Sequence, residues 1–259
     1  MEVEAETQTD LSETLARWLD TPRGRYIRDW EQSQVDAAID DVFGFHAIQM
    51  GLGGVDFLRE NRIPLKVRAG TGALTSLRCT PEHLPLASHS IDLLVLPHVL
   101  EFSDHPHQIL REAERVLIPE GQIVICGFNP LSLWGARRSL GAALGWDENF
   151  CPWNGRFIGL LRLKDWLALL GFELSGGRFG CYAPPFVQAK WLERSAFMER
   201  AGERWWPIAG GVYVVRAVKR HVGMRLVMPT WRDARAKRPA LVQVARRDNV
   251  IHVRPTQRR

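Results

Sequence analysis

Residues 91–102 read IDLLVLPHVLEF, and residues 109–125 read ILREAERVLIPEGQIVI. The first run opens with a nearly unbroken series of large apolar residues, which is typical of a strand covered on both faces of a sheet. The second run begins with an apolar stripe at helical spacing, turns at residues 119–121 and continues as another apolar strand at residues 122–127. A strand, a helix and a strand in succession predict a right-handed crossover in a parallel α/β sheet.

The same alternation continues on both sides of this block. Short apolar runs predict five more strands, which makes a sheet of seven, at residues 46–50, 64–68, 74–79, 211–219 and from residue 172. Helical spacing and start signals predict helices at residues 12–20, 26–43, 55–60, 103–117, 163–170 and within 187–206.

This pattern predicts three segments. They are an N-terminal helical extension at residues 1–43, a core domain at residues 44–220 and a tail at residues 221–259. Residues 129–162 are rich in Gly, Trp and Asn, and we interpret them as an insertion that could form a lid over a pocket.

The composition limits the class of protein. With 259 residues, 46% of them hydrophobic, the chain can bury a substantial core, and no run approaches the ~18 apolar residues of a membrane-spanning helix. The N-terminus is acidic and lacks the basic start and apolar run of an export signal. The four cysteines form no CxxC pair, so we expect reduced thiols, a cytoplasmic location and no metal site.

The net charge of +5 is unevenly distributed. Residues 221–259 contain ten Lys or Arg against two Asp, a net charge of +8, which leaves −3 for the rest of the chain. A basic tail of this kind can bind the phosphates of a nucleic acid, and the alternative is a solvated extension. Both interpretations remain open, and the sequence does not define an oligomeric state.

Candidate site residues follow the predicted strands, because ligands of open parallel sheets bind beyond the carboxyl ends of the strands. Gly51, Gly53 and Gly54 follow the first strand, where glycine lets a ligand approach the backbone. His98 follows the fourth strand and is a candidate to take a proton from an acceptor hydroxyl or amine. The alternative for His98, and for nearby Glu101, is that the side chain only holds its loop in place.

Aromatic residues gather after the fifth predicted strand. Asn129 could line an acceptor pocket, and two groups of tryptophans either pack the fold or form the wall of an apolar acceptor site. These tryptophans are Trp134, Trp146, Trp153, Trp191, Trp205 and Trp206.

From Leu84 onward the chain resembles class I S-adenosylmethionine-dependent methyltransferases of the ubiquinone-biosynthesis type. The resemblance rests on the short runs LPL at 84–86, SIDL at 90–93, HVLE at 98–101, RVL at 115–117 and PEG at 119–121. It implies a Rossmann-like three-layer sandwich, in which the last strand of a mostly parallel seven-stranded sheet is antiparallel. It also implies S-adenosylmethionine as the cofactor.

The half of the chain before Leu84 departs from the family pattern. Gln49 stands where the family has an acidic residue, Thr80 stands where it often has an Asp near the adenine, and no acidic residue occurs between Glu60 and Glu82 to bind the ribose. Losing one hydrogen bond to a charged group costs about 1.5–3 kcal/mol, or roughly 10- to 150-fold in affinity. The cofactor-binding positions that the resemblance implies are Gln49, Gly51, Gly53, Gly54, Thr80, Glu82, Leu84, Pro97 and His98.

The hypothesis from the sequence is therefore a methyltransferase that acts on an unknown acceptor, which we expect to be a small molecule. The alternative is a non-catalytic protein of the same fold that binds or regulates a partner, including a nucleic acid through the basic tail. A dinucleotide-binding pattern fails at Asp56, and Gly70-Thr71-Gly72 lacks the lysine of a phosphate loop, so we interpret that triplet as a plain loop.

Overall fold

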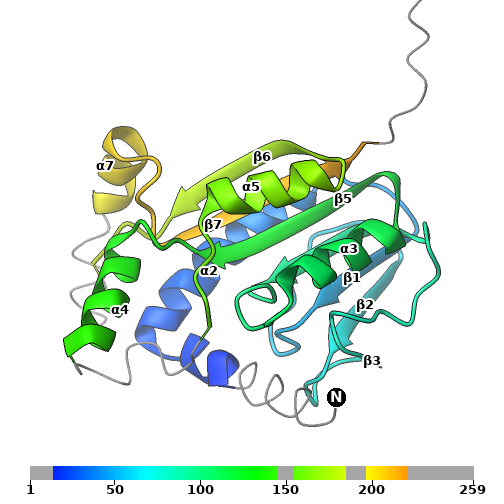
Figure 1. Ribbon diagram of the computed structural model, residues 1–259, viewed down its shortest axis with the longest axis horizontal. Helices are drawn as coiled ribbons and strands as arrows, with labels where there is room; N and C mark the ends of the chain where they lie inside the picture. Colours follow the sequence, from blue (N-terminus) through cyan, green and yellow to red (C-terminus); the bar gives the residue numbers. More distant parts are fainter. Residues whose placement is uncertain (1–13, 145–154, 185–196, 221–259) are drawn as a thin grey trace, which may run out of the picture. The chain divides into compact units, whose positions relative to one another are not determined.

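The computed structural model of this chain describes residues 14–144, 155–184 and 197–220 (Figure 1). The chain forms two compact units, Met1–His221 and Val222–Arg259, and the described residues all belong to the first. Its seven strands are β1 His46–Met50, β2 Leu65–Gly70, β3 Leu77–Arg78, β4 Ile91–Pro97, β5 Leu117–Phe128, β6 Phe172–Gly180 and β7 Val212–Lys219. The helices are α2 Pro22–Ile39, α3 Pro106–Val116, α4 Leu133–Leu144, α5 Leu160–Leu169 and α7 Phe197–Trp205.

One sheet contains all seven strands, in the order β3-β2-β1-β4-β5-β7-β6. The first five strands pair in parallel, whereas β7 lies between β5 and β6 and is antiparallel to both. The Rossmann-like sheet with an antiparallel last strand, which the resemblance implied, is therefore confirmed.

The sheet has a hydrophobic cluster on each face, and β4 shows how one strand serves both. Leu93 and Val95 pack in the cluster that includes α2, while Leu94 and Leu96 pack in the cluster that includes α3 and α5. Successive side chains of a strand point to opposite faces, so a strand that is buried on both sides must be apolar throughout. The unbroken apolar run of β4 thus has a structural cause.

Helix α2 begins earlier than the predicted residue 26 because Thr21 caps it. The Thr21 hydroxyl oxygen accepts a hydrogen bond from the Gly24 N–H at 3.2 Å, and Pro22 occupies the first turn. At the other end, the Asn61 side-chain amide donates to the carbonyls of Ile39 and Val42. These bonds tie the segment before β2 to the end of α2, where the Ile39 carbonyl also accepts from the Val42 N–H.

The helix predicted at residues 55–60 is wrong, because these residues form turns. The Gln49 side chain explains the difference. Its amide nitrogen donates to the carbonyls of Gly51, Leu52 and Val55, and its oxygen accepts from the Phe57 N–H at 2.9 Å. The buried Gln49 side chain thus stabilises an irregular loop, in which the Val55 carbonyl and the Phe57 N–H bind a side chain.

The third predicted strand, at residues 74–79, is only two residues long in the structure. Leu74 begins this stretch in a turn, and the hydroxyl of the next residue, Thr75, donates to the Gly72 carbonyl at 2.7 Å. The side chain therefore stabilises a turn where the sequence pattern predicted a strand.

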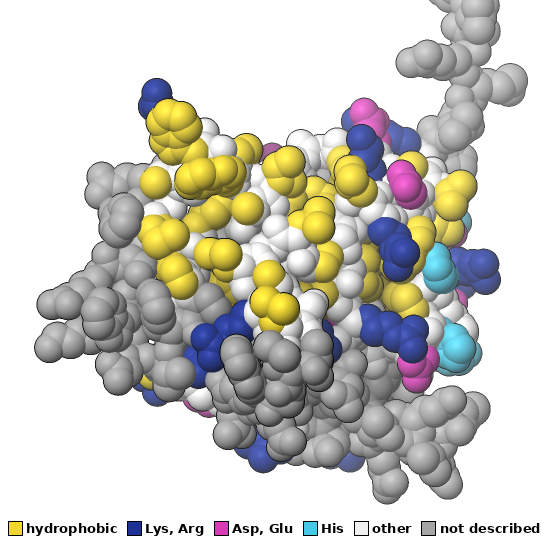
Figure 2. Space-filling view, turned by 60° about the vertical axis from the view of Figure 1, so that its left-hand side comes forward, with side chains coloured by type: hydrophobic (Ala, Val, Ile, Leu, Met, Phe, Trp, Pro, Cys, Tyr) yellow, Lys and Arg dark blue, Asp and Glu magenta, His cyan; other side chains and the backbone are white. Residues whose placement is uncertain are grey.

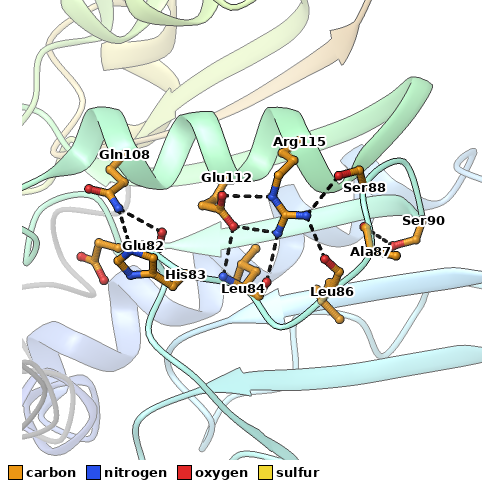
Figure 3. A network of polar contacts seen from close by, with 10 residues as sticks. All are labelled: Glu82, His83, Leu84, Leu86, Ala87, Ser88, Ser90, Gln108, Glu112 and Arg115. Carbon is orange, nitrogen blue, oxygen red and sulfur yellow. Dashed lines mark hydrogen bonds and ion pairs between the residues drawn. The ribbon is translucent and has the colours of Figure 1, made fainter.

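A polar network fixes α3 against the loop before β4 (Figure 3). The Arg115 guanidinium donates to Glu112, to the carbonyls of Leu84 and Leu86 and to the Ser88 hydroxyl. Glu112 in turn accepts from the Leu84 N–H at 3.1 Å. The short runs that carry the resemblance are thus joined in space, and they hold the loop whose first residues approach the ligand edge of the sheet.

Candidate functional site

A cleft of about 540 Å³, its open mouth included, lies at the carboxyl ends of β1, β2 and β4. The strand order reverses at this point of the sheet, because the chain runs outward from β1 through β2 to β3 and then crosses to the other side of β1 as β4. Ligands of open α/β sheets bind at such switch points. The lining residues are Leu15, Met50, Gly51, Leu52, Gly53, Gly70, Thr71, Gly72, Thr75, Pro81, Pro97, His98, Val99 and Phe102.

Four of the nine predicted cofactor-binding residues line this cleft: Gly51, Gly53, Pro97 and His98. Gly51 has a φ of +76°, and a Cβ there would lie 3.1 Å from the Val99 side chain. A Cβ on Gly53 would lie 3.0 Å from the backbone of Leu74. Both positions therefore require glycine, one for its backbone conformation and both for close approach.

The other five predicted residues are not among the lining residues. Gln49 organises the glycine loop from beneath, and a Cβ on Gly54 would contact the Leu74 side chain. The Thr80 carbonyl accepts from the His83 N–H, Glu82 accepts from the Ser103 hydroxyl, and the Leu84 N–H donates to Glu112. Their assignment as cofactor contacts stays a prediction.

The sequence reading missed the loop after β2. Gly70, Thr71, Gly72 and Thr75 line the cleft, although the first three were interpreted as a plain loop. The phosphate-loop pattern is absent here. Glycines at the end of a strand nevertheless indicate, as they do after β1, a place where a ligand can approach the backbone. Leu15 was also missed, because its distance in sequence from the sheet gave no indication that it reaches the ligand edge.

His98 lies between two carboxylates. Its Nδ1 is 2.9 Å from Glu101 Oε2, and its Nε2 is 2.9 Å from Glu31 Oε1 of α2. All three side chains are at most 2% exposed. Glu101 Oε1 also accepts a hydrogen bond from the Phe128 N–H at the end of β5. The three residues form a buried charged cluster, which we call the Glu31–His98–Glu101 cluster.

The electrostatics of this cluster favour a charged imidazole. Burial by itself would lower the pKa of His98, but the charges of Glu31 and Glu101 and the hydrogen bond with Glu101 outweigh it and raise the pKa to about 10. Burial raises the pKa of Glu101, and the contact with His98 opposes that shift. Burial, followed by the charges of Glu31 and Glu101, also raises the pKa of the Cys126 thiol well above its usual value.

The backbone at His98 is in an unusual conformation. Its φ is +56°, a region that side-chain-bearing residues rarely adopt, and its N–H donates to the Cys126 carbonyl at 3.0 Å. The imidazole ring packs against Phe128, with ring centroids 4.5 Å apart. Strained conformations of this kind persist where the surrounding structure holds them, and they cluster at functional sites.

None of the described tryptophans lines the cleft, and the aromatic wall stays a prediction. Trp134 is buried, and its indole N–H donates to the Ala183 carbonyl. Trp205 and Trp206 are 71% and 66% exposed, close to α7. Figure 2 shows hydrophobic side chains gathered on the side of the molecule that carries α4 and α7. Residues Trp146, Trp153 and Trp191 lie outside the described residues.

The Asn129 side chain makes hydrogen bonds that link two segments of the backbone. Its side-chain amide donates to the carbonyls of Ile208 and Gly210, and its oxygen accepts from the Leu131 N–H. It therefore joins the end of β5 to the segment before β7 and is not among the residues that line the cleft.

Three further observations concern the described residues only. No group of three or more His, Cys, Asp or Glu side chains there could hold a metal ion. Cys79, Cys126 and Cys181 are free thiols, and Cys151 lies outside the described residues. None of the described helices combines the length and the apolar character that crossing a membrane requires.

Comparisons with known proteins agree with this architecture. The sequence model of the family described as a methyltransferase domain matches residues 52–125. The uncharacterized protein YafS of Escherichia coli strain K12 is 35% identical over 165 residues, which cover 62% of this chain and 67% of that protein. The matched family segment contains most of the residues that line the cleft.

Two solved structures share the fold at low sequence identity. One is from the complex of the Haloferax volcanii Trm112 methyltransferase activator with a methyltransferase, with a TM-score of 0.57, 13% identity and coverage of 82% of this chain and 99% of that one. The other is an S-adenosylmethionine-dependent methyltransferase of Thermotoga maritima, with a TM-score of 0.53, 18% identity and coverage of 81% and 100%. The chain belongs to the family of class I S-adenosylmethionine-dependent methyltransferases.

Proposed function

We propose that this chain binds S-adenosylmethionine in the cleft at the carboxyl ends of β1, β2 and β4 and transfers its methyl group to a small-molecule acceptor. The observation that carries the proposal is the position of the cleft. It lies at the switch point of the sheet, and glycines that cannot be replaced without a clash form part of its wall.

The lining residues suit such a ligand in shape. Gly51 and Gly53 allow the ligand to approach the backbone, and Thr71 and Thr75 add hydroxyl groups after β2. Apolar side chains, among them Leu15 and Phe102, exclude water from the cleft. When bound, S-adenosylmethionine supplies a methyl group already activated on a sulfonium, so the protein has to contribute mainly alignment and exclusion of water.

His98 contributes to this proposal through its position. Each ring nitrogen is 2.9 Å from a carboxylate oxygen, so neither is free to accept a proton from an acceptor unless the ring turns. We therefore propose that His98 shapes the cleft and holds the loop after β4, in keeping with the second of the two roles considered for it. No additional general base is needed for an acceptor that is nucleophilic in its neutral form.

The test is calorimetric titration of the full chain with S-adenosylmethionine and S-adenosylhomocysteine. We expect binding of both, at least about tenfold weaker than in a site with a ribose carboxylate, because such a bond is worth roughly 1.5–3 kcal/mol. The variant Val99→Phe fills the cleft and should abolish binding. Leu65→Phe, at the exposed start of β2, is the matched control and should bind like the wild type. No heat from either ligand at millimolar concentration would overturn the proposal.

A further inference from the structure

None of the described residues that line the cleft carries a carboxylate. Among the described residues that line it, His98 is the only ionisable side chain. The acidic residues that the family places around its cofactor are replaced here by Gln49 and Thr80, or are missing after β2. S-adenosylmethionine carries a positive charge on its sulfur, so a wall of this composition supplies no charge of the opposite sign.

Two carboxylates lie directly behind His98, however. Both oxygens of Glu101 accept hydrogen bonds, one from the Phe128 N–H and one from the His98 ring. Glu31 is fully buried, its Oε1 lies 2.9 Å from His98 Nε2, and its Oε2 has no hydrogen-bond partner among the described residues. With a charged imidazole between two ionised carboxylates, the Glu31–His98–Glu101 cluster carries one negative charge in excess.

Because the cluster is buried, its charge acts over a longer distance than a charge on the surface would. All three side chains are removed from solvent, and charges in such surroundings are screened far less than charges on the surface. Burial, and after it the charge of Glu31, raises the pKa of both the Cys126 and the Cys181 thiol well above its usual value. The excess charge therefore acts over the edge of the sheet at which the cleft opens.

We propose that the Glu31–His98–Glu101 cluster supplies the negative field by which the cleft prefers a cationic sulfonium ligand over its neutral thioether product. Glu31, which the helix before β1 contributes, is then a specificity-determining residue that acts through His98. As a lone pair of the acceptor forms the new bond to the methyl carbon, the sulfur–carbon bond breaks and the sulfur keeps the bonding pair and becomes neutral. The positive charge passes to the acceptor, which then loses a proton to solvent. The attraction is lost at that step, which favours release of the product. The inference rests on the proposed function.

The test compares two affinities in the same protein. Dissociation constants for S-adenosylmethionine and S-adenosylhomocysteine are measured by calorimetry on the full-length wild type and on Glu31→Gln. We expect Glu31→Gln to lower the preference for the sulfonium ligand by about tenfold, the effect of removing one charge at partly shielded range. A variant that is only partly folded loses both affinities in proportion, so the ratio of the two constants isolates the charge.

Asp29→Asn is the matched control, because it removes one carboxylate from the exposed face of the same helix and should leave the ratio unchanged. If Glu31→Gln does not fold, Glu101→Gln gives the same comparison and still offers an acceptor to the Phe128 N–H. An unchanged ratio in a variant that binds both ligands overturns this inference alone. A wild type that binds neither ligand overturns the proposed function and the inference together.

Discussion

The charge of the His98 ring predicts how the stability of the protein depends on pH. Its pKa of about 10 in the folded protein lies above the ordinary value, so its contribution to stability is complete below about pH 6.5 and is lost as the pH rises toward 10. In urea unfolding between pH 6 and pH 10, we expect the free energy of unfolding of the wild type to fall as the pH rises. The slope should approach the value for one proton released on unfolding. His98→Gln should lack that component of the slope.

The same residue can be observed directly by NMR. The His98 ring should remain protonated at pH 8, whereas the exposed His105 serves as the comparison within the same spectrum. A His98 ring that titrates near 6.5, or equal slopes for the wild type and His98→Gln, would show that the two carboxylates do not hold the proton.

The packing of α3 against the loop before β4 depends on Arg115. The planar guanidinium donates at once to Glu112 and to the carbonyls of Leu84 and Leu86, a set that a lysine ammonium cannot reproduce. We expect Arg115→Lys to lower the free energy of unfolding by about 1–2 kcal/mol, as measured by chemical denaturation. Arg111→Lys, on the exposed face of the same helix, is the control and should change it little. Equal losses in the two variants would contradict the assigned role of the network.

The elements differ in how far the sequence predicted them, and the reasons are physical. The apolar run of β4 and the stripe of α3 were predictable because burial on two faces, or on one, sets a periodicity that survives in the sequence. The helix predicted at residues 55–60 is absent from the structure, because the Gln49 side chain reaches forward from the preceding strand and binds the Val55 carbonyl and the Phe57 N–H. The periodicity within a segment does not show that a side chain from outside the segment binds its backbone groups.

The residues of the candidate site were likewise only partly predictable from the sequence. The glycines after β1 and the position of His98 followed from where strands end, a rule that applies to any open parallel sheet. Glu31 could not be found in this way, because it belongs to a helix far from His98 in sequence and is polar on a helix with a weakly amphipathic pattern. Only the folded arrangement brings Glu31 against His98 and accounts for a buried acid at that position.

In the whole molecule, the division into the units Met1–His221 and Val222–Arg259 allows the cleft and the basic tail to be tested apart. Every described element and every residue of the cleft belongs to the first unit, whereas residues 221–259 carry the excess of positive charge. A chain that ends at residue 221 should therefore unfold cooperatively and bind S-adenosylmethionine as the full chain does. Its retention on heparin or RNA should fall, and the retention of the full chain should decline steeply with salt.

A second variant separates charge from length in this experiment. A full-length chain in which the arginines after residue 221 are replaced by glutamine keeps the tail but removes most of its charge. If the tail acts through its charge, this variant should elute from heparin like the shortened chain, because counterion release depends on the number of neutralised phosphates. Retention equal to that of the wild type in both variants would remove the tail from consideration as a nucleic-acid contact. Loss of S-adenosylmethionine affinity on shortening would instead show that the second unit supports the cleft.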